Sequence, residues 1–338
     1  MNAKYLNPLN RLKMLTDCWN MSGRIKSKLC LNDMRVSKSR ISICIDYLIG
    51  WLKHGYSLVQ YEDYEIYKYS DIVQKNIVTN RRALKLEELC NNPDGVKWLN
   101  DKKLFNKRFS KYVTRKWVQP SSVSKDEFVE FFKDEGKVIV KPIGGEKGEG
   151  IYIKELDNPI IDLANLYMKL SKKDYIVEEV IEQHPSIRFN RNSVNTIRMY
   201  TILDPNNKAH LIKSVLRVGA LNQSVDNYHC GGTIWPLNTE GGFIECPGKS
   251  LKDIKPIYSL PFDGTFMLGY KIPNYDNAVL AVCDAAESIP EVRYLGWDVA
   301  VTSNGIEIIE ANSSPDNDFH CIGNDNNYYG KMLALINN

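Results

Sequence analysis

The spacing of apolar residues changes near residue 100, and the first hundred residues are predicted to be mainly helical. Between Ile41 and Leu52 apolar side chains recur at steps of three and four, which is the spacing of one helix face. Ser37 is the expected N-cap of that helix. A second helix is predicted over residues 79–90, because the turn-forming residues 91–95 follow it. The tyrosine-rich run 56–69 is left unassigned.

Residues 101–181 alternate between helix and strand patterns. A helix over 102–113 comes first, and Ser124 is the candidate cap of the next one. Then follow a β-branched strand, a glycine-rich turn, a second strand, a helix and a third strand, over 137–141, 144–150, 151–154, 160–170 and 175–178. This order within about 45 residues is typical of a compact α+β unit.

The rest of the chain reads mainly as strands. Strand patterns cover 196–203, 210–218, 232–236, 297–302 and 306–310, with one helix predicted over 277–288. A large antiparallel sheet is the natural interpretation. The predicted fold class is therefore α+β, with a helical region over 1–100 and two further units over 101–181 and 182–338.

Composition excludes several classes of function. The net charge of +3 argues against a global field for nucleic acid or an anionic membrane. No run approaches about 18 apolar residues, so no transmembrane segment is expected. The start lacks the apolar region of a signal peptide. Eight cysteines without a C-x-x-C pair indicate neither a zinc site nor a disulfide framework, which favours a cytoplasmic location.

The first 40 residues are rich in lysine and arginine. We interpret them as a solvated helix face; an anionic or lipid-linked glycan partner is the alternative.

Near the C-terminus, polar residues interrupt an apolar hairpin. Asp298 lies in one strand, and Glu310 and Asn312 lie two residues apart in the returning strand, so the last two share a face. A few oxygen ligands on one face suit Mg²⁺, which takes its other ligands from phosphate and water. The alternative is a solvated polar hairpin.

Further polar residues mark the ends of other predicted strands. Lys141 ends a buried-type strand before the glycine-rich turn, where backbone N–H groups can approach phosphates. Arg198 has apolar neighbours and so needs an anionic partner, either a ligand or a structural carboxylate. Arg217 could stabilise an oxyanion, and Asn227 could line a phosphate or carboxylate subsite. Taken alone, the acidic stretch 178–182 is an ordinary strand end.

In this order, the pieces over residues 101–316 resemble the ATP-grasp superfamily, most of all its sugar-transfer-associated branch. The resemblance rests on a lysine, a glycine-rich hairpin, a Glu-Glu-x-Ile hinge, an arginine strand and Asp…Glu-x-Asn. It implies two α+β subdomains that hold ATP between them, preceded here by a helical region in place of the usual α/β subdomain.

The resemblance also implies roles for single residues. Arg198, Arg217 and Asn227 would be catalytic, and Asp298, Glu310 and Asn312 would bind Mg²⁺. For the second ATP lysine we choose Lys107, with Lys102 and Lys103 as rivals; Glu182 or His184 would face the ribose. The residues assigned to ATP are Lys107, Lys141, Gly144, Gly145, Gly148, Glu178, Glu179, Val180, Ile181, Glu182 and His184.

The activity implied is that of an ADP-forming carboxylate–amine ligase, with an acyl-phosphate intermediate and with ATP and Mg²⁺ as cofactors. The expected partners are a small-molecule carboxylate and an amine, for instance a sugar acid and an amino acid in surface polysaccharide (capsule or O-antigen) biosynthesis. The alternatives are a protein- or peptide-modifying amino-acid ligase, a kinase and a nucleotide-binding module without turnover. The oligomeric state is left open.

Overall fold

The structure is a computed structural model that describes residues 8–32, 38–144, 150–190, 193–221, 231–250, 256–316 and 328–337. Its contacts divide the chain into two compact units. The first is Met1–Leu86 with Asp316–Leu333, and the second is Glu87–Pro315 with Ala334–Asn338. The division crosses helices α5 (Asn80–Cys90) and α11 (Tyr328–Asn337). The boundaries near residues 100 and 181 stay predictions.

The first unit is helical, as expected. The tyrosine-rich run that the sequence left unassigned forms short helices and contributes to the core together with α1 (Pro8–Asn32) and α2 (Arg40–His54). Tyr56 and Tyr61 stack with ring centroids 5.4 Å apart, and the Tyr61 hydroxyl donates a hydrogen bond to Asp46 at 2.5 Å. The short helices of this run are α3 (Leu58–Asp63) and the 3₁₀ turn Ile66–Lys68. The unit also contains α4 (Asp71–Gln74).

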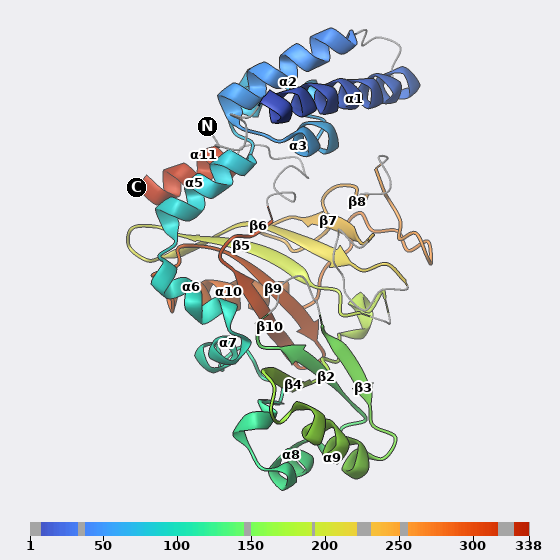
Figure 1. Cartoon of the computed structure of the whole chain (residues 1–338), viewed down its shortest axis with the longest axis vertical. Coiled ribbons are helices and arrows are strands. Elements are labelled where there is room, and N and C mark those ends of the chain that lie inside the picture. Colours follow the sequence, from blue (N-terminus) through green and yellow to red (C-terminus); the bar gives the residue numbers. More distant parts are fainter. Residues whose placement is uncertain are drawn as a thin grey trace. The chain divides into compact units, whose positions relative to one another are not determined.

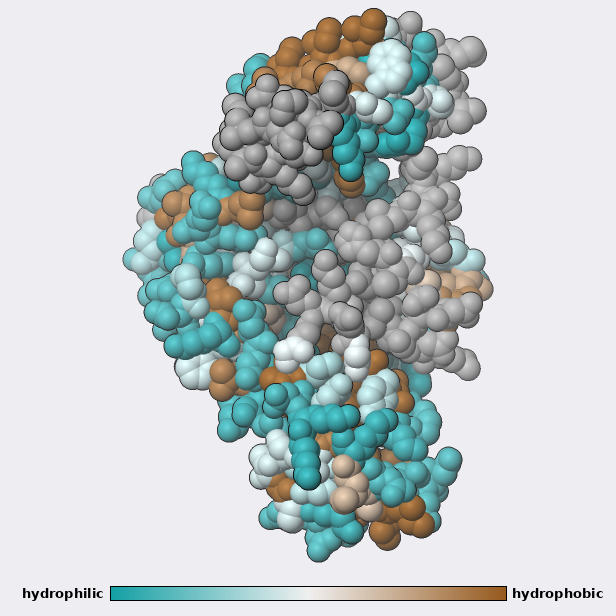
Figure 2. All heavy atoms as spheres, in the orientation of Figure 1, coloured by the Kyte–Doolittle hydropathy of each residue, from teal (hydrophilic) through white to brown (hydrophobic). Residues whose placement is uncertain are grey.

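Residues at both ends of helix α2 explain where it begins and ends. Its N-cap is Ser39, whose side chain accepts a hydrogen bond from the Ser42 amide, and Gly55 ends it in the left-handed region at φ 77°. Ser37, the expected cap, lies outside the described residues. The outward face of α2 is apolar and forms the brown ridge of Figure 2, made of Ile41, Ile45, Ile49 and Leu52.

The second unit contains two antiparallel sheets (Figure 1). The smaller sheet has the order β1-β4-β2-β3. Helices α8 (Lys125–Phe132) and α9 (Pro159–Leu170) share a core with its strands, and Ser124 caps α8 through a capping box, as predicted. Its strands are β1 (Trp117–Val118), β2 (Lys137–Pro142), β3 (Tyr152–Glu155) and β4 (Tyr175–Glu179).

The larger sheet has the order β10-β9-β5-β6-β7-β8. Helix α10 (Tyr275–Glu287) packs on it and buries small residues such as Ala278 and Ala285 against the strands. The strands are β5 (Ile197–Leu203), β6 (Ala209–Val218), β7 (Thr233–Leu237), β8 (Lys249–Ser250), β9 (Tyr294–Thr302) and β10 (Gly305–Asn312). The mixed α+β fold with antiparallel sheets is therefore confirmed.

Two short helices precede the small sheet, α6 (Pro93–Asn100) and α7 (Lys102–Arg108). Helix α7 ends five residues before the expected Val113, because the chain turns at Phe109, which packs edge-on against Trp297 of β9 at 5.5 Å. Within the described part of the chain, no helix combines the length and apolar character that crossing a bilayer requires.

The core of the small sheet gives a first testable prediction. Phe128 on α8 is fully buried, whereas Phe131 on the same helix is 43% exposed. Phe128→Ala should lower the free energy of unfolding by about 3–5 kcal/mol, because it leaves a cavity. Phe131→Ala, the matched control, should cost less than about 1 kcal/mol. Urea titration followed by circular dichroism measures both; equal losses would contradict this packing.

Candidate active site

Lys141 and Glu178 form a buried ion pair in neighbouring strands of the small sheet. Lys141 lies near the end of β2 and Glu178 near the end of β4, and Nζ of Lys141 is 2.5 Å from Oε2 of Glu178. Asn106 on α7 donates from Nδ2 to the other carboxylate oxygen at 2.9 Å. Two residues that the resemblance assigned to ATP therefore contact each other directly.

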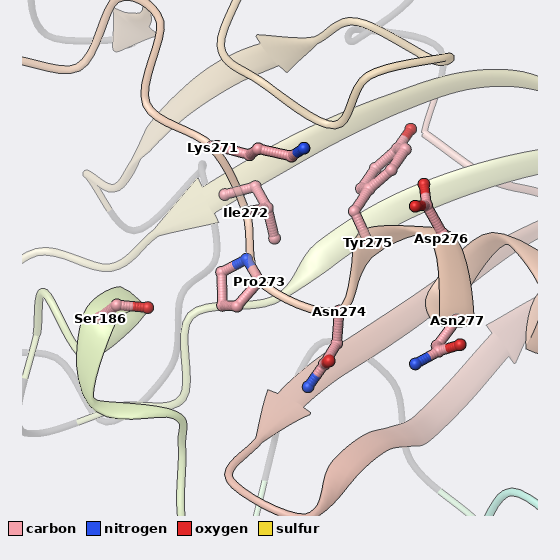
Figure 3. A pocket seen from close by; sticks show the side chains of 8 residues that line it. All are labelled: Ser186, Lys271, Ile272, Pro273, Asn274, Tyr275, Asp276 and Asn277. Atoms are coloured by element: carbon pink, nitrogen blue, oxygen red, sulfur yellow. The ribbon is translucent and has the colours of Figure 1, made fainter.

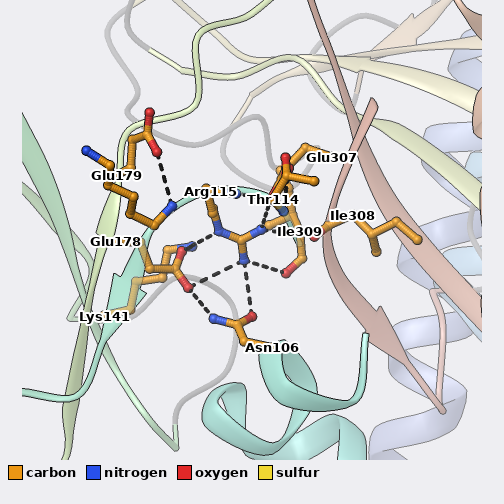
Figure 4. A network of polar contacts seen from close by, with 10 residues as sticks. Asn106, Thr114, Arg115, Lys141, Glu178, Glu179, Glu307, Ile308 and Ile309 are labelled. Carbon is orange, nitrogen blue, oxygen red and sulfur yellow. Dashed lines mark hydrogen bonds and ion pairs between the residues drawn. The ribbon is translucent and has the colours of Figure 1, made fainter. Parts of the chain in front are cut away.

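Arg115 connects this pair to the large sheet (Figure 4). Its Nε donates to Glu178 at 2.9 Å, and one of its terminal nitrogens lies 2.6 Å from Glu307 of β10. Glu307 also accepts from the backbone amide of Thr114 at 3.0 Å and from its hydroxyl at 2.6 Å. The Arg115, Glu178 and Glu307 side chains are 4%, 1% and 3% exposed. One guanidinium thus joins β4 of the small sheet to β10 of the large sheet.

The charges in this cluster stabilise one another. Burial alone would raise the pKa of Glu178, but Arg115 and Lys141 outweigh burial and hold the pKa below its usual range. The pKa of Arg115 is raised by Glu178 and Glu307 against the effect of burial. Since the pKa of Glu178 is lowered in the folded chain, its stabilising effect is present at neutral pH. It is lost as pH falls through and below the ordinary value of about 4.3.

A β-bulge in β10 places the predicted metal ligands on one face. Ile308 pairs with Val299, but Glu310 pairs with Asp298, so the register shifts by one residue at Ile309. Without that extra residue, Glu310 would point to the opposite face from Asp298. The bulge therefore creates the pairing of Asp298 with Glu310 that the hairpin pattern led us to expect.

Two arginines hold Asp298 from the neighbouring strands. Arg198 of β5 pairs with Asp298 in the ladder and donates from Nε at 2.5 Å. Arg217 of β6 donates to the other oxygen of Asp298 at 2.7 Å and also contacts the Thr196 hydroxyl. Burial alone would raise the pKa of Asp298, but the two guanidinium groups lower it. Arg198 and Arg217, predicted from separate motifs, thus meet at one carboxylate.

Glu310 differs from Asp298 in its surroundings. It is exposed, whereas Asp298 is buried, and it accepts a hydrogen bond from Asn312 Nδ2 at 3.3 Å. Partial desolvation by the protein atoms around it and the neighbouring charge of Asp298 raise the pKa of Glu310. Two carboxylates in this proximity favour a cation between or beside them.

These oxygen ligands fit Mg²⁺ in type, because it prefers carboxylate, amide and phosphate oxygens. Among the described residues, no group of three or more His, Cys, Asp or Glu side chains gathers as a metal cluster. Any cation here would therefore rest on Glu310, Asn312 and the remaining lone pairs of Asp298, and would take its other ligands from phosphate or water.

The upstream lysines differ in position. Lys102, at the start of α7, is half-buried; its Nζ lies 3.4 Å from the Ile143 carbonyl oxygen, and its pKa responds to Glu310, Lys141 and Glu178. Burial lowers that pKa, while Glu310 offsets part of the effect. Lys107, our choice from the sequence, is exposed near the other end of the helix. Lys102 therefore lies nearer to Lys141 and Glu310, while the assignment of an ATP lysine among Lys102, Lys103 and Lys107 stays a prediction.

The predicted hinge follows β4. Glu179 is half-buried; its backbone amide donates to the Lys116 carbonyl oxygen at 2.9 Å, and its carboxylate accepts from the Lys116 amide at 3.0 Å. Val180 and Ile181 continue without regular structure. Glu182 is exposed. His184 caps a 3₁₀ turn (Pro185–Ile187) by accepting from the Ser186 amide at 3.2 Å. Because its ring nitrogen caps this turn, that nitrogen is not available to a ribose hydroxyl, and the assignment of His184 to the ribose stays a prediction.

Some predicted residues lie outside the described part of the chain. These are Gly145 and Gly148 of the glycine-rich turn and Asn227. Gly144 is described and lies exposed just after β2.

The sequence did not point to Arg115, Asn106 or Glu307. Arg115 precedes a two-residue strand and belongs to no recognisable motif. Glu307 carried a weak signal, because it is a charged residue in an apolar strand.

An open pocket of about 530 Å³ lies elsewhere on the large sheet, at the start of α10 (Figure 3). Lys271, Asn274 and Asn277 line it, but Asn274 and Asn277 point away from Lys271. Its polar groups do not converge on one point.

Comparison with known proteins identifies the family. Residues 81–333 match the model of the sugar-transfer associated ATP-grasp family, so the chain belongs to this family. No curated protein matches the chain.

Several solved structures are similar at low identity. One is the ATP-grasp ligase PsnB complexed with a phosphomimetic variant of a minimal precursor, Mg and ADP, with 14% identity and a TM-score of 0.42, covering 78% of this chain and 66% of that one. Another is an N5-carboxyaminoimidazole synthetase from Staphylococcus aureus complexed with ADP, with 13% identity and a TM-score of 0.44, covering 70% and 52%. The chain thus spans less than two thirds of the length of both proteins.

The Arg115 cluster gives a prediction on stability. Arg115→Met would leave Glu178 and Glu307 buried without their shared cation, which should cost about 3–5 kcal/mol of unfolding free energy. Lys116→Met is the control, because its ion pair with Glu135 lies at the surface and should contribute less than about 1 kcal/mol. Chemical denaturation of both variants decides the point; similar losses would show that Arg115 does not hold the sheets together.

The lysines give a prediction on nucleotide binding. Lys102→Met should weaken binding of Mg·ATP at least about tenfold, because it removes a charge-assisted contact beside Lys141 and Glu310. Lys107→Met should change the affinity less than about twofold. Isothermal titration calorimetry with a non-hydrolysable ATP analogue measures both constants, and the reverse order of effects would restore Lys107 as the ATP lysine.

Proposed function

We propose that the chain is an ADP-forming carboxylate–amine ligase that makes an amide bond through an acyl-phosphate. The supporting observation is the face shared by Arg198, Arg217, Asp298 and Glu310, with Lys102 close enough to Glu310 for the two charges to interact. Phosphoryl transfer to a carboxylate needs neutralised charge and fixed positions more than it needs a protein nucleophile.

Each residue of that face has a proposed task. Lys141 and Lys102 would neutralise phosphate charge, and the ammonium of Lys141 keeps N–H donors beyond the one directed at Glu178. Glu310 and Asn312 would position the cation that ATP brings. Arg198 and Arg217 would face the activated carboxylate, where negative charge grows as the amine attacks.

The proposed reaction balances in two steps. A substrate carboxylate oxygen takes the γ-phosphoryl group, and ADP leaves. The amine nitrogen then attacks the carbonyl carbon, a C–N bond forms, and the C–O bond to phosphate breaks with release of inorganic phosphate and a proton. For the substrates, we propose a sugar acid and an amino acid in surface polysaccharide biosynthesis, in line with the description of the family.

The test is a phosphate-release screen with ATP, Mg²⁺, hexuronic acids and amino acids. Release that requires both a carboxylate and an amine is the expected result. Phosphorylated carboxylate that accumulates without any need for an amine would show a kinase instead. ATP binding without turnover on every pair would show a binding module.

Glu310→Gln tests the metal side of the same proposal. Turnover should fall at least about 100-fold with circular dichroism unchanged, because the variant loses the solvent-open carboxylate beside Asp298. Glu240→Gln, an exposed change in a turn, is the control and should keep wild-type turnover. Unchanged turnover in Glu310→Gln would refute the metal assignment.

A further inference from the structure

A second open pocket, of about 470 Å³, lies where α5 and α6 face the segment that follows β10. Its volume is within the range of small-molecule sites, about 300–1,000 Å³. The polar residues that line it are Glu87, Asn91, Lys97, Asn100, Ser313 and Ser314.

This pocket adjoins the predicted metal ligands. Ser313, which forms part of its wall, directly follows Asn312 in the chain. Asn91 fixes that wall, because its Nδ2 donates to the Ser313 carbonyl oxygen at 2.7 Å and to the Tyr294 carbonyl oxygen at 2.9 Å. Its Oδ1 accepts from the Tyr294 amide at 2.9 Å. The wall is therefore tied to β9, the strand that carries Asp298.

The pocket presents one carboxylate that lacks a cation. Glu87 is half-buried and accepts a hydrogen bond from the Ser314 hydroxyl at 2.9 Å. Among the described residues, no lysine, arginine or histidine forms an ion pair with it. Desolvation raises the pKa of Glu87, and the hydrogen bond from Ser314 offsets part of this effect. A ligand ammonium would supply the missing cation.

A cation lies on the same pocket. Lys97 of α6 is exposed there and, within the described ranges, takes part in none of the ion pairs. A carboxylate and an ammonium that line one pocket without pairing with each other complement a zwitterion. Val96 and Pro93 add apolar surface for a short side chain.

We propose that this pocket binds the amine co-substrate as an amino acid, with its ammonium held by Glu87 and its carboxylate by Lys97. The inference rests on the proposed ligase function and names where the amine enters, which is beside Asn312.

The experiment separates carboxylate activation from binding of the amine. Phosphate release is measured with ATP, Mg²⁺ and a hexuronic acid, once with hydroxylamine as a small nucleophile that needs no pocket and once with glycine, alanine, serine, glutamate or lysine. Glu87→Gln should keep hydroxylamine turnover within about twofold. Its KM for the amino acid should rise about 10- to 100-fold, because a charge-assisted contact is lost. Glu88→Gln, an exposed neighbour on α5, is the matched control and should behave as wild type.

Lys97→Gln should also raise the KM for the amino acid, but leave that for methylamine unchanged, since methylamine has no carboxylate. Equal behaviour of Glu87→Gln and Glu88→Gln would overturn the inference. So would a loss of hydroxylamine turnover in Glu87→Gln, which would show a structural role. Wild-type turnover with hydroxylamine but with no amino acid would overturn the inference and leave carboxylate activation intact.

If the wild-type protein turns over with neither nucleophile, the ligase proposal fails. Whether the pocket binds amino acids is then tested by direct binding. Saturation-transfer NMR with the same five amino acids should then show binding to wild type and Glu88→Gln but not to Glu87→Gln. Binding to all three proteins alike, or to none, would overturn the pocket assignment.

Discussion

The buried guanidinium of Arg115 bonds to both sheets of the second unit and so links them. It reaches Glu178 in the small sheet and Glu307 in the large one, across 63 and 192 residues of sequence. Removing such ions from water costs several kcal/mol each, so the group is stable only while every partner stays in place. With Lys141 included, the cluster has two cations and two anions and is neutral as it stands.

A second cluster has the same balance. Arg198 and Arg217 face Asp298 and Glu310, again two cations and two anions. A polyphosphate would add several negative charges to this face. In the proposed site, a divalent cation at Glu310 and the lysines near it would offset these charges.

The sequence predicted contacts between residues that are near in the chain, but not contacts between residues that are far apart in it. The hairpin that carries Asp298, Glu310 and Asn312 spans few residues, so the turn was enough to predict that its two strands pair. The bulge at Ile309, which puts Glu310 on the face of Asp298, could not be predicted from alternation. Arg115 and Asn106 have partners far along the chain, and no local pattern signals them. A motif does not separate Lys102 from Lys107, because their surroundings depend on where α7 starts and on which end of it lies beside Ile143.

The bulge at Ile309 shows how local geometry sets the chemistry of the site. A regular β10 would place Glu307 and Ile309 on the face of Asp298 and send Glu310 to the other side. With the bulge, Glu307 and Glu310 lie on the same face, so one strand serves both clusters: Glu307 binds Arg115, and Glu310 faces Asp298. The same strand therefore connects the buried Arg115 cluster to the face of Asp298, since Glu307 and Glu310, the predicted metal ligand, lie only three residues apart in β10.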